Sequence, residues 1–155
     1  MARSERCERP GKPDAFEVAD RLHSAAIHLL RYAAKPDLLS GQGPARLSAL
    51  SVLVFGGRKT LGELAAAERV KPPTMSRIVA GLKRSGLARV QNDLKDARKI
   101  WISVTPKGER VLQEARRRRI RALAEALASL DAHELETLGG AAGLMERIAD
   151  QATRS

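Results

Sequence analysis

The chain has 155 residues, of which 43% are hydrophobic, and it carries 28 lysines and arginines against 18 aspartates and glutamates. This length and apolar content are typical of one globular unit with its own core, which excludes a disordered polycation. Apolar runs are far shorter than the roughly 18 residues that span a bilayer, and the polar start lacks an apolar signal region, so we expect a cytoplasmic protein.

The N-terminal part is predicted to be a tail followed by one helix. Residues 1–13 are charged and interrupted by prolines and a glycine, which predicts a flexible tail. Asp14 and Glu17 form a capping-box pattern, and apolar residues then recur at helical spacing. Lys35-Pro36 ends this helix, because the residue before a proline disfavours the helical conformation.

Three short helices are predicted in the middle of the chain. The first is a buried, leucine-rich helix that Gly56-Gly57 stops. Thr60 and Glu63 form a capping box at the start of the second. Pro72-Pro73 suits the first turn of the third, where a missing N–H costs nothing, and this helix is predicted to run to Arg84.

A β-hairpin is predicted after these helices. Gly86 fits the position just past the end of a helix. Residues 87–91 and 99–104 have the composition and alternation of two strands, and residues 92–98 form the tip between them.

Two long helices are predicted to end the chain. Thr105-Pro106 places a cap and a proline at the start of the first, which extends to about Leu130. Asp131 and Glu134 form a capping box for the second. The expected fold class is therefore α+β and mostly α.

The positive charge is concentrated in the central part of the chain. Residues 41–110 contain 14 basic and 5 acidic residues, a balance of +9, whereas residues 1–40 and 111–155 have balances of +1 and 0. Such a segment suits a surface that faces phosphate groups. The chain has only four aromatic residues, too few for the stacking platforms of single-strand binders, so a duplex is the better target.

The third of the short helices has two distinct faces on a helical wheel. Its apolar stripe consists of Met75, Ile78, Val79 and Leu82. The opposite side consists of Pro73, Ser76, Arg77, Ala80, Gly81 and Arg84. Small residues beside two arginines suit a helix in the major groove, where guanidinium groups bond guanine O6 and N7. A solvated cationic face is the alternative, but the adjoining capped helix and basic hairpin favour DNA.

The hairpin tip carries a second basic group. Asp96 and Arg98 are two residues apart, hence on one face of an extended strand, so the carboxylate can hold the guanidinium as it reaches outward. Lys95 and Lys99 add positive charge. An arginine on a thin ribbon suits the narrow minor groove, and a weak surface salt bridge is the alternative interpretation.

The sequence from Leu61 to Gly108 resembles the winged helix-turn-helix of the MarR (multiple antibiotic resistance regulator) family. The shared pattern comprises Thr-x-Ser-Arg at residues 74–77, Leu-x-x-x-Gly-Leu at 82–87, Asp-x-x-Asp-x-Arg at 93–98 and Val-Thr-Pro-x-Gly at 104–108. The resemblance covers about residues 45–110 in detail, and the flanking helices match in number and placement.

The resemblance implies a residue role for each part of the module. Asp96 would orient Arg98 for the minor groove, and Ser76 and Arg77 would meet bases or phosphates in the major groove. The residues predicted to contact or support contacts with DNA are Lys71, Pro73, Thr74, Ser76, Arg77, Arg84, Lys95, Asp96, Arg98 and Lys99.

The same resemblance implies the organisation of the chain. The predicted units are a tail (1–13), an N-terminal dimerisation helix (14–40), a winged helix-turn-helix DNA-binding lobe (41–108) and C-terminal dimerisation helices (109–155). Apolar stripes on the outer helices, which a small lobe covers only in part, also predict a homodimer.

Three other features are interpreted as lacking a site. The arginine run 116–119 sweeps nearly a full helical turn, so most of it is expected to be solvated, with some members near DNA or paired with acids of a partner chain. His23 and His28 lie on different helix faces, so we expect no metal site. Cys7 precedes the first helix, which argues against the thiol sensing of some MarR relatives.

We expect a DNA-binding transcriptional regulator, a ligand-responsive repressor that binds a pseudo-palindromic operator as a homodimer. A sequence-tolerant architectural duplex-binding protein is the alternative, and competition by random duplex separates the two. An enzyme or interaction module that borrows the fold is a third class, but the sequence shows no catalytic motif and implies no cofactor. An effector in such a fold would lie in the crevice between the dimerisation helices and the DNA-binding lobe, but the residues that would hold it are not predicted.

Overall fold

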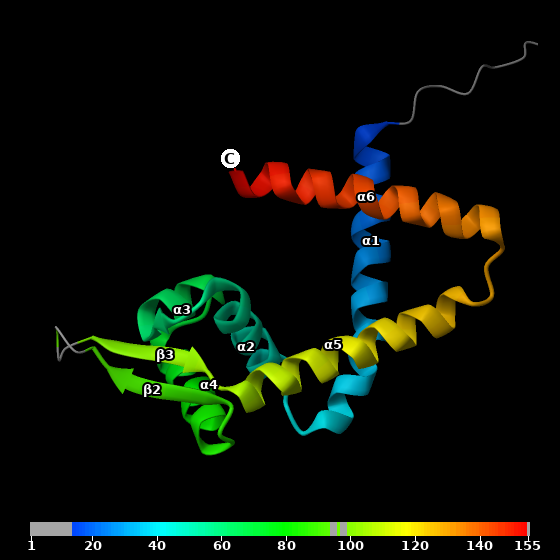
Figure 1. Ribbon diagram of the computed structural model, residues 1–155. Coiled ribbons are helices and arrows are strands. Elements are labelled where there is room, and N and C mark those ends of the chain that lie inside the picture. Colours follow the sequence, from blue (N-terminus) through cyan, green and yellow to red (C-terminus); the bar gives the residue numbers. More distant parts are fainter. Residues whose placement is uncertain (1–13, 94–95, 97–98, 155) are drawn as a thin grey trace, which may run out of the picture.

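The computed structural model of the chain describes residues 14–93, 96 and 99–154, without the side chains of residues 38–40 and 152–154 (Figure 1). The predicted tail with Cys7 lies outside this part. So do Lys95 and Arg98 at the tip of the predicted hairpin of residues 87–104, which is the wing of the module. In the described residues, six α-helices and one 3₁₀ helix accompany a three-stranded sheet. The expected mostly helical α+β class is confirmed.

The first helix, α1 (Ala15–Ala34), begins at the predicted cap. The carboxylate of Asp14 accepts a hydrogen bond of 3.2 Å from the backbone N–H of Phe16. After Ala34 the chain tightens into the 3₁₀ helix η1 (Lys35–Ser40), which the sequence patterns do not predict. Pro36 ends the α-helical pattern here but leaves room for this tighter turn.

Helix α2 (Pro44–Gly56) ends as predicted, with Gly57 at φ 71°. In α3 (Leu61–Ala67) the capping box is complete, because the Thr60 side chain and the Glu63 carboxylate each accept from the other residue's backbone N–H. The pKa of Glu63 is lowered from its usual value, mainly by the hydrogen bond from the Thr60 backbone N–H and secondly by the one from the Thr60 hydroxyl.

Helix α4 (Pro72–Arg84) has the predicted limits, and Gly86 follows it at φ 69°. The turn between α3 and α4 is closed by a hydrogen bond of 3.0 Å from the N–H of Val70 to the carbonyl of Ala65. Together, α3, this turn and α4 form the helix-turn-helix.

The sheet has the order β1-β3-β2 and is antiparallel throughout. The predicted hairpin consists of β2 (Ala88–Asn92) and β3 (Ile100–Val104), in a register that pairs Val90 with Ile102. The third strand, β1 (Lys59–Thr60), was not predicted, because two residues carry no alternating pattern and it pairs with a distant strand.

The last two helices differ in how they contact the rest of the chain. Helix α5 (Pro106–Leu127) packs against α1, η1 and α2 and ends three residues earlier than predicted. Helix α6 (Ala132–Arg154) starts at the predicted box, where Asp131 and Glu134 exchange hydrogen bonds of 3.0 and 2.8 Å. In Figure 1, α5 leads away from the helix-turn-helix lobe, and α6 turns back from the far end of α5 and crosses α1 in this view.

The hydrophobic core lies in the lobe, between α2, α3, α4, the sheet and the first turns of α5. Its largest fully buried side chains are Leu50, Leu53, Leu64, Met75, Leu82, Leu87 and Ile102. Among the described side chains of α6, by contrast, none is buried. No helix in the described part of the chain is long and apolar enough to span a membrane.

Candidate nucleic-acid interface

Helix α4 is fixed in the lobe by the apolar stripe that the wheel predicts. Met75 and Leu82 are fully buried, Val79 is nearly so, and Ile78 packs against the same core. The opposite side of the helix is turned to solvent. Its exposed residues are Pro73, Thr74, Ser76, Arg77, Ala80 and Arg84, with Lys71 exposed at the N-cap. The structure therefore brings the predicted α4 residues together on one surface.

Gly81 lies on the outward side of the wheel, as predicted. The expectation that this side is open to DNA was wrong at Gly81, because the residue is buried. A Cβ atom at Gly81 would lie 2.6 Å from Nη2 and 2.9 Å from Cζ of Arg46, which comes from the first turn of α2. A helical wheel assigns faces within one helix and gives no sign of a side chain from another helix. A glycine inside a helix on its outward face was the one local signal of a close approach.

No ion pair among the described residues involves Arg46, Arg77 or Arg84. The acidic residues of the lobe are few, so the guanidinium groups keep their charge available to an external anion. Such a surface favours association with phosphate groups and predicts a strong dependence of binding on salt.

The base of the wing is held by Asp93. Its carboxylate accepts a hydrogen bond of 2.6 Å from Nε1 of Trp101 and one of 3.1 Å from the backbone N–H of Asp96. Backbone hydrogen bonds from Asp93 to Lys99, and from Lys99 to Asp96, close the same turn. Asp96 and Lys99 are exposed here, as predicted for a wing tip. The predicted pairing of Asp96 with Arg98 falls outside the described residues.

Arg58 adds a cation beside the wing that the sequence patterns do not single out. Its guanidinium carbon lies 4.5 Å from the ring centre of Trp101, which is a cation–π contact. Arg58 directly precedes β1, and β1 pairs with β3 where Trp101 lies. The position of this arginine therefore depends on a strand pairing that local patterns do not reveal.

The Val-Thr-Pro-x-Gly motif joins the end of α4 to the start of α5. The hydroxyl of Thr105 donates to the carbonyl of Gly86 over 2.7 Å and accepts from the N–H of Gly108 over 3.0 Å. A Cβ atom at Gly108 would collide with the backbone carbonyl of Leu87. Glycine is needed because the two chain segments approach too closely for any side chain.

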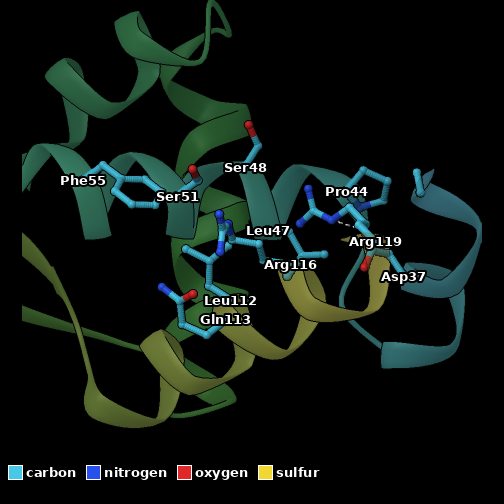
Figure 2. A pocket seen from close by; sticks show the side chains of 11 residues that line it. Asp37, Pro44, Leu47, Ser48, Ser51, Phe55, Leu112, Gln113, Arg116 and Arg119 are labelled. Carbon is cyan, nitrogen blue, oxygen red and sulfur yellow. Dashed lines mark ion pairs between the residues drawn. The ribbon is translucent and has the colours of Figure 1, made fainter. Parts of the chain in front are cut away.

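A pocket of about 430 Å³ lies outside the DNA-facing surface, between η1, α2 and α5 (Figure 2). Its lining includes Asp37, Leu47, Ser51, Phe55, Gln113, Arg116 and Arg119. In Figure 2 the residues of α2 and those of α5 face each other across this space. The sequence predicted none of these lining residues.

An ion pair closes one end of the pocket. Nε of Arg119 lies 3.0 Å from Oδ2 of Asp37, whose side chain is buried. The expectation that the arginine run 116–119 is solvated or paired with a partner chain is wrong for Arg119, which pairs within its own chain. Arg116 and Arg117 are exposed, as expected, and Arg118 is half-buried.

Comparison with known proteins places the chain among transcriptional regulators. An uncharacterized HTH-type transcriptional regulator of Mycobacterium bovis is 36% identical over 134 residues, which is 86% of this chain and 94% of that protein. No protein-family model matches the chain.

Solved structures share the fold over nearly their whole length. A MarR family protein from Bacillus stearothermophilus has a TM-score of 0.72 and 24% identity, covering 87% of this chain and 94% of that one. A transcriptional regulator from Thermotoga maritima also has a TM-score of 0.72 and 24% identity, covering 87% and 98%. The winged-helix architecture predicted from the sequence is thereby confirmed.

Proposed function

The chain belongs to the HTH-type transcriptional regulators with the MarR fold, and from this premise we propose that it represses transcription as a homodimer on a pseudo-palindromic duplex operator. Helix α4 enters the major groove, and the wing reaches the adjacent minor groove. The contacts come from the ten residues that the sequence predicts at α4 and the wing.

One observation carries this proposal, the exposed face of α4. A buried stripe holds the helix firmly while Ser76, Arg77 and Arg84 point away from the core. A helix can read base edges when its backbone is held rigidly and its outer face carries small and cationic side chains. In this proposal Arg77 and Ser76 contact bases or phosphates, and Arg98 on the wing contacts the minor groove.

The homodimer is supported by apolar surface on the outer helices. Large apolar side chains of α1 and α6 are exposed to solvent in the single chain; they include Phe16, Leu29, Leu30, Leu138, Leu144 and Ile148. So many exposed large apolar side chains on two helices indicate an interaction surface. A two-fold interface would bury them and set two copies of α4 about 34–36 Å apart, one duplex turn.

We propose the domain limits on the same basis: dimerisation by residues 14–40 and 109–155, and DNA binding by residues 41–108. The core supports this division, because its buried cluster runs from α2 to β3 and includes only Leu112 from α5. The pocket between η1, α2 and α5 is our candidate effector site. A ligand there would touch elements of both units, and one that binds more tightly to another arrangement of the units would shift the protein toward that arrangement.

Selection of duplexes from a random pool by the purified protein tests the proposal. We expect enrichment of an inverted repeat, and a preference over random duplex of about 10³ or more. Light scattering at micromolar concentration should give the mass of a dimer. Equal affinity for all duplexes would instead support the architectural alternative, and a monomer that binds one half-site tightly would contradict the dimer.

A further inference from the structure

Arg46 occupies a position that helix electrostatics disfavour. It lies in the first turn of α2, where the helix dipole repels cations, and that turn contains no acidic residue. Its guanidinium donates a long hydrogen bond of 3.4 Å to the side-chain oxygen of Gln42. Local electrostatics within α2 therefore do not explain an arginine at this position.

Arg46 contacts Gly81 on α4, the recognition helix of the proposed DNA complex. Glycine inside a helix is destabilising relative to every residue except proline, yet it stands in the middle of α4. The guanidinium of Arg46 fills the space that a side chain at Gly81 would need, with Nη2 at 2.6 Å from a built Cβ and Nε at 2.9 Å. The glycine thus lets the cation lie directly on the helix surface.

The position over Gly81 places Arg46 on the face of α4 that carries two of the predicted DNA-contacting residues. Arg77 is four residues before Gly81 and Arg84 three residues after it, so both lie on the same helix face as Gly81. Both side chains are exposed, and no ion pair among the described residues neutralises either of them. Cations that share one surface repel each other, and an anion bound beside them reduces that repulsion.

We propose that Arg46 is a further DNA-contacting residue, which forms with Arg77 and Arg84 a site for one phosphate group of the duplex backbone. The inference rests on the proposed function. A guanidinium can bind a phosphate through two parallel hydrogen bonds, and such contacts fix register on the duplex without reading sequence. Arg46, from α2, would thereby set how α4 lies in the groove.

Four proteins test this inference: Arg46→Ala, Arg46→Lys, Gly81→Ala and the Arg46→Ala/Gly81→Ala double variant. The probes are a duplex selected by the parent protein and an unrelated duplex of equal length, each titrated at several salt concentrations. Arg121→Ala, which removes an exposed arginine of α5, is the matched charge control. Because α5 belongs to the proposed dimerisation unit, light scattering checks that this variant has the mass of the parent. Thermal unfolding checks that every variant is folded.

We expect Arg46→Ala to weaken binding to both duplexes by the same factor, about tenfold. The slope of log affinity against log salt should fall by about 0.9 for each phosphate that the variant no longer neutralises. Arg46→Lys should keep the parent slope, because the charge remains, and Arg121→Ala should match the parent in both measurements.

The Gly81→Ala variant tests whether DNA binding depends on the contact between the Arg46 guanidinium and Gly81. In the parent background, the methyl group of Gly81→Ala displaces the guanidinium and should weaken binding although it favours the helix. In the Arg46→Ala background the same change should have no further effect, since the group it displaces is gone.

Several results would overturn the inference while leaving the proposed function intact. One is an Arg46→Ala variant with the affinity and salt slope of the parent. Another is an equal loss from Gly81→Ala in both backgrounds. A third is a changed sequence preference in Arg46→Ala, which would indicate a base contact. A parent that does not prefer its selected duplex contradicts the proposed function, and the unrelated duplex then still decides the role of Arg46.

Discussion

The indole N–H of Trp101 and the carboxylate of Asp93 form a hydrogen bond of 2.6 Å that joins the two wing strands just below their tip. The same carboxylate accepts the backbone N–H of Asp96, so one side chain connects the tip to the sheet. Arg58, which directly precedes β1, also stacks on the Trp101 ring. The ring therefore contacts both the tip of the hairpin and the segment that leads into β1.

Trp101→Phe should loosen the wing without unfolding the lobe. The change keeps an aromatic ring for Arg58 but removes the donor to Asp93, and a hydrogen bond to a charged group contributes about 1.5–3 kcal/mol. We expect faster amide exchange in residues 92–100 and weaker operator binding. Exchange rates equal to those of the parent would show that the backbone hydrogen bonds alone hold the wing.

Gly108→Ala should destabilise the whole lobe. An added methyl group meets the carbonyl of Leu87, a backbone atom that cannot move without disturbing the end of α4. Overpacking of this kind costs about 1–3 kcal/mol, and denaturant unfolding would measure it. Gly62→Ala in α3 provides the control within the same lobe, because no atom outside the adjoining helix backbone lies within 4 Å of a Cβ there, and it should be neutral or stabilising.

Arg98→Ala should weaken operator binding by about 1–3 kcal/mol, because it removes the proposed minor-groove cation and leaves the charge of Asp96 unopposed beside DNA. Folding should be unaffected. Binding titrations of parent and variant at one salt concentration provide the comparison. Identical affinities would rule out the wing contact.

Arg77→Ala distinguishes two roles on the recognition helix. The phosphate site proposed with Arg46 predicts that affinity falls evenly across sequences. A variant that instead tolerates other bases at one operator position would show that Arg77 bonds a base edge and does not belong to that site. Selection from a random duplex pool with each protein reads out both outcomes. A variant unchanged in affinity and preference would mean that α4 does not contact the duplex at this residue.

Deletion of residues 131–155 should abolish the dimer and tight operator binding, although it removes no proposed DNA contact. The lobe should stay folded, since no described α6 side chain is buried in its own chain. Light scattering measures the assembly, and circular dichroism reports the remaining helices. A truncated protein that still dimerises would move the interface away from α6.

The sequence predicted the elements whose signals are local. The box of Thr60 and Glu63, the prolines that open α4 and the glycine after Arg84 each act within one or two helical turns, through hydrogen bonds and φ values that nearby residues determine. Apolar periodicity added the buried face of α4. Charge distribution and the motifs along residues 61–108 then indicated a DNA-binding module.

Tertiary structure alone decided which distant residues meet. Arg46 lies on Gly81, Arg119 pairs with Asp37, and Lys59 and Thr60 form a strand only because β3 lies beside them. None of these contacts leaves a periodic trace, since each depends on how whole helices and strands pack. Helix periodicity assigns a residue to a face, but the surrounding elements decide whether that face is open, covered or charged.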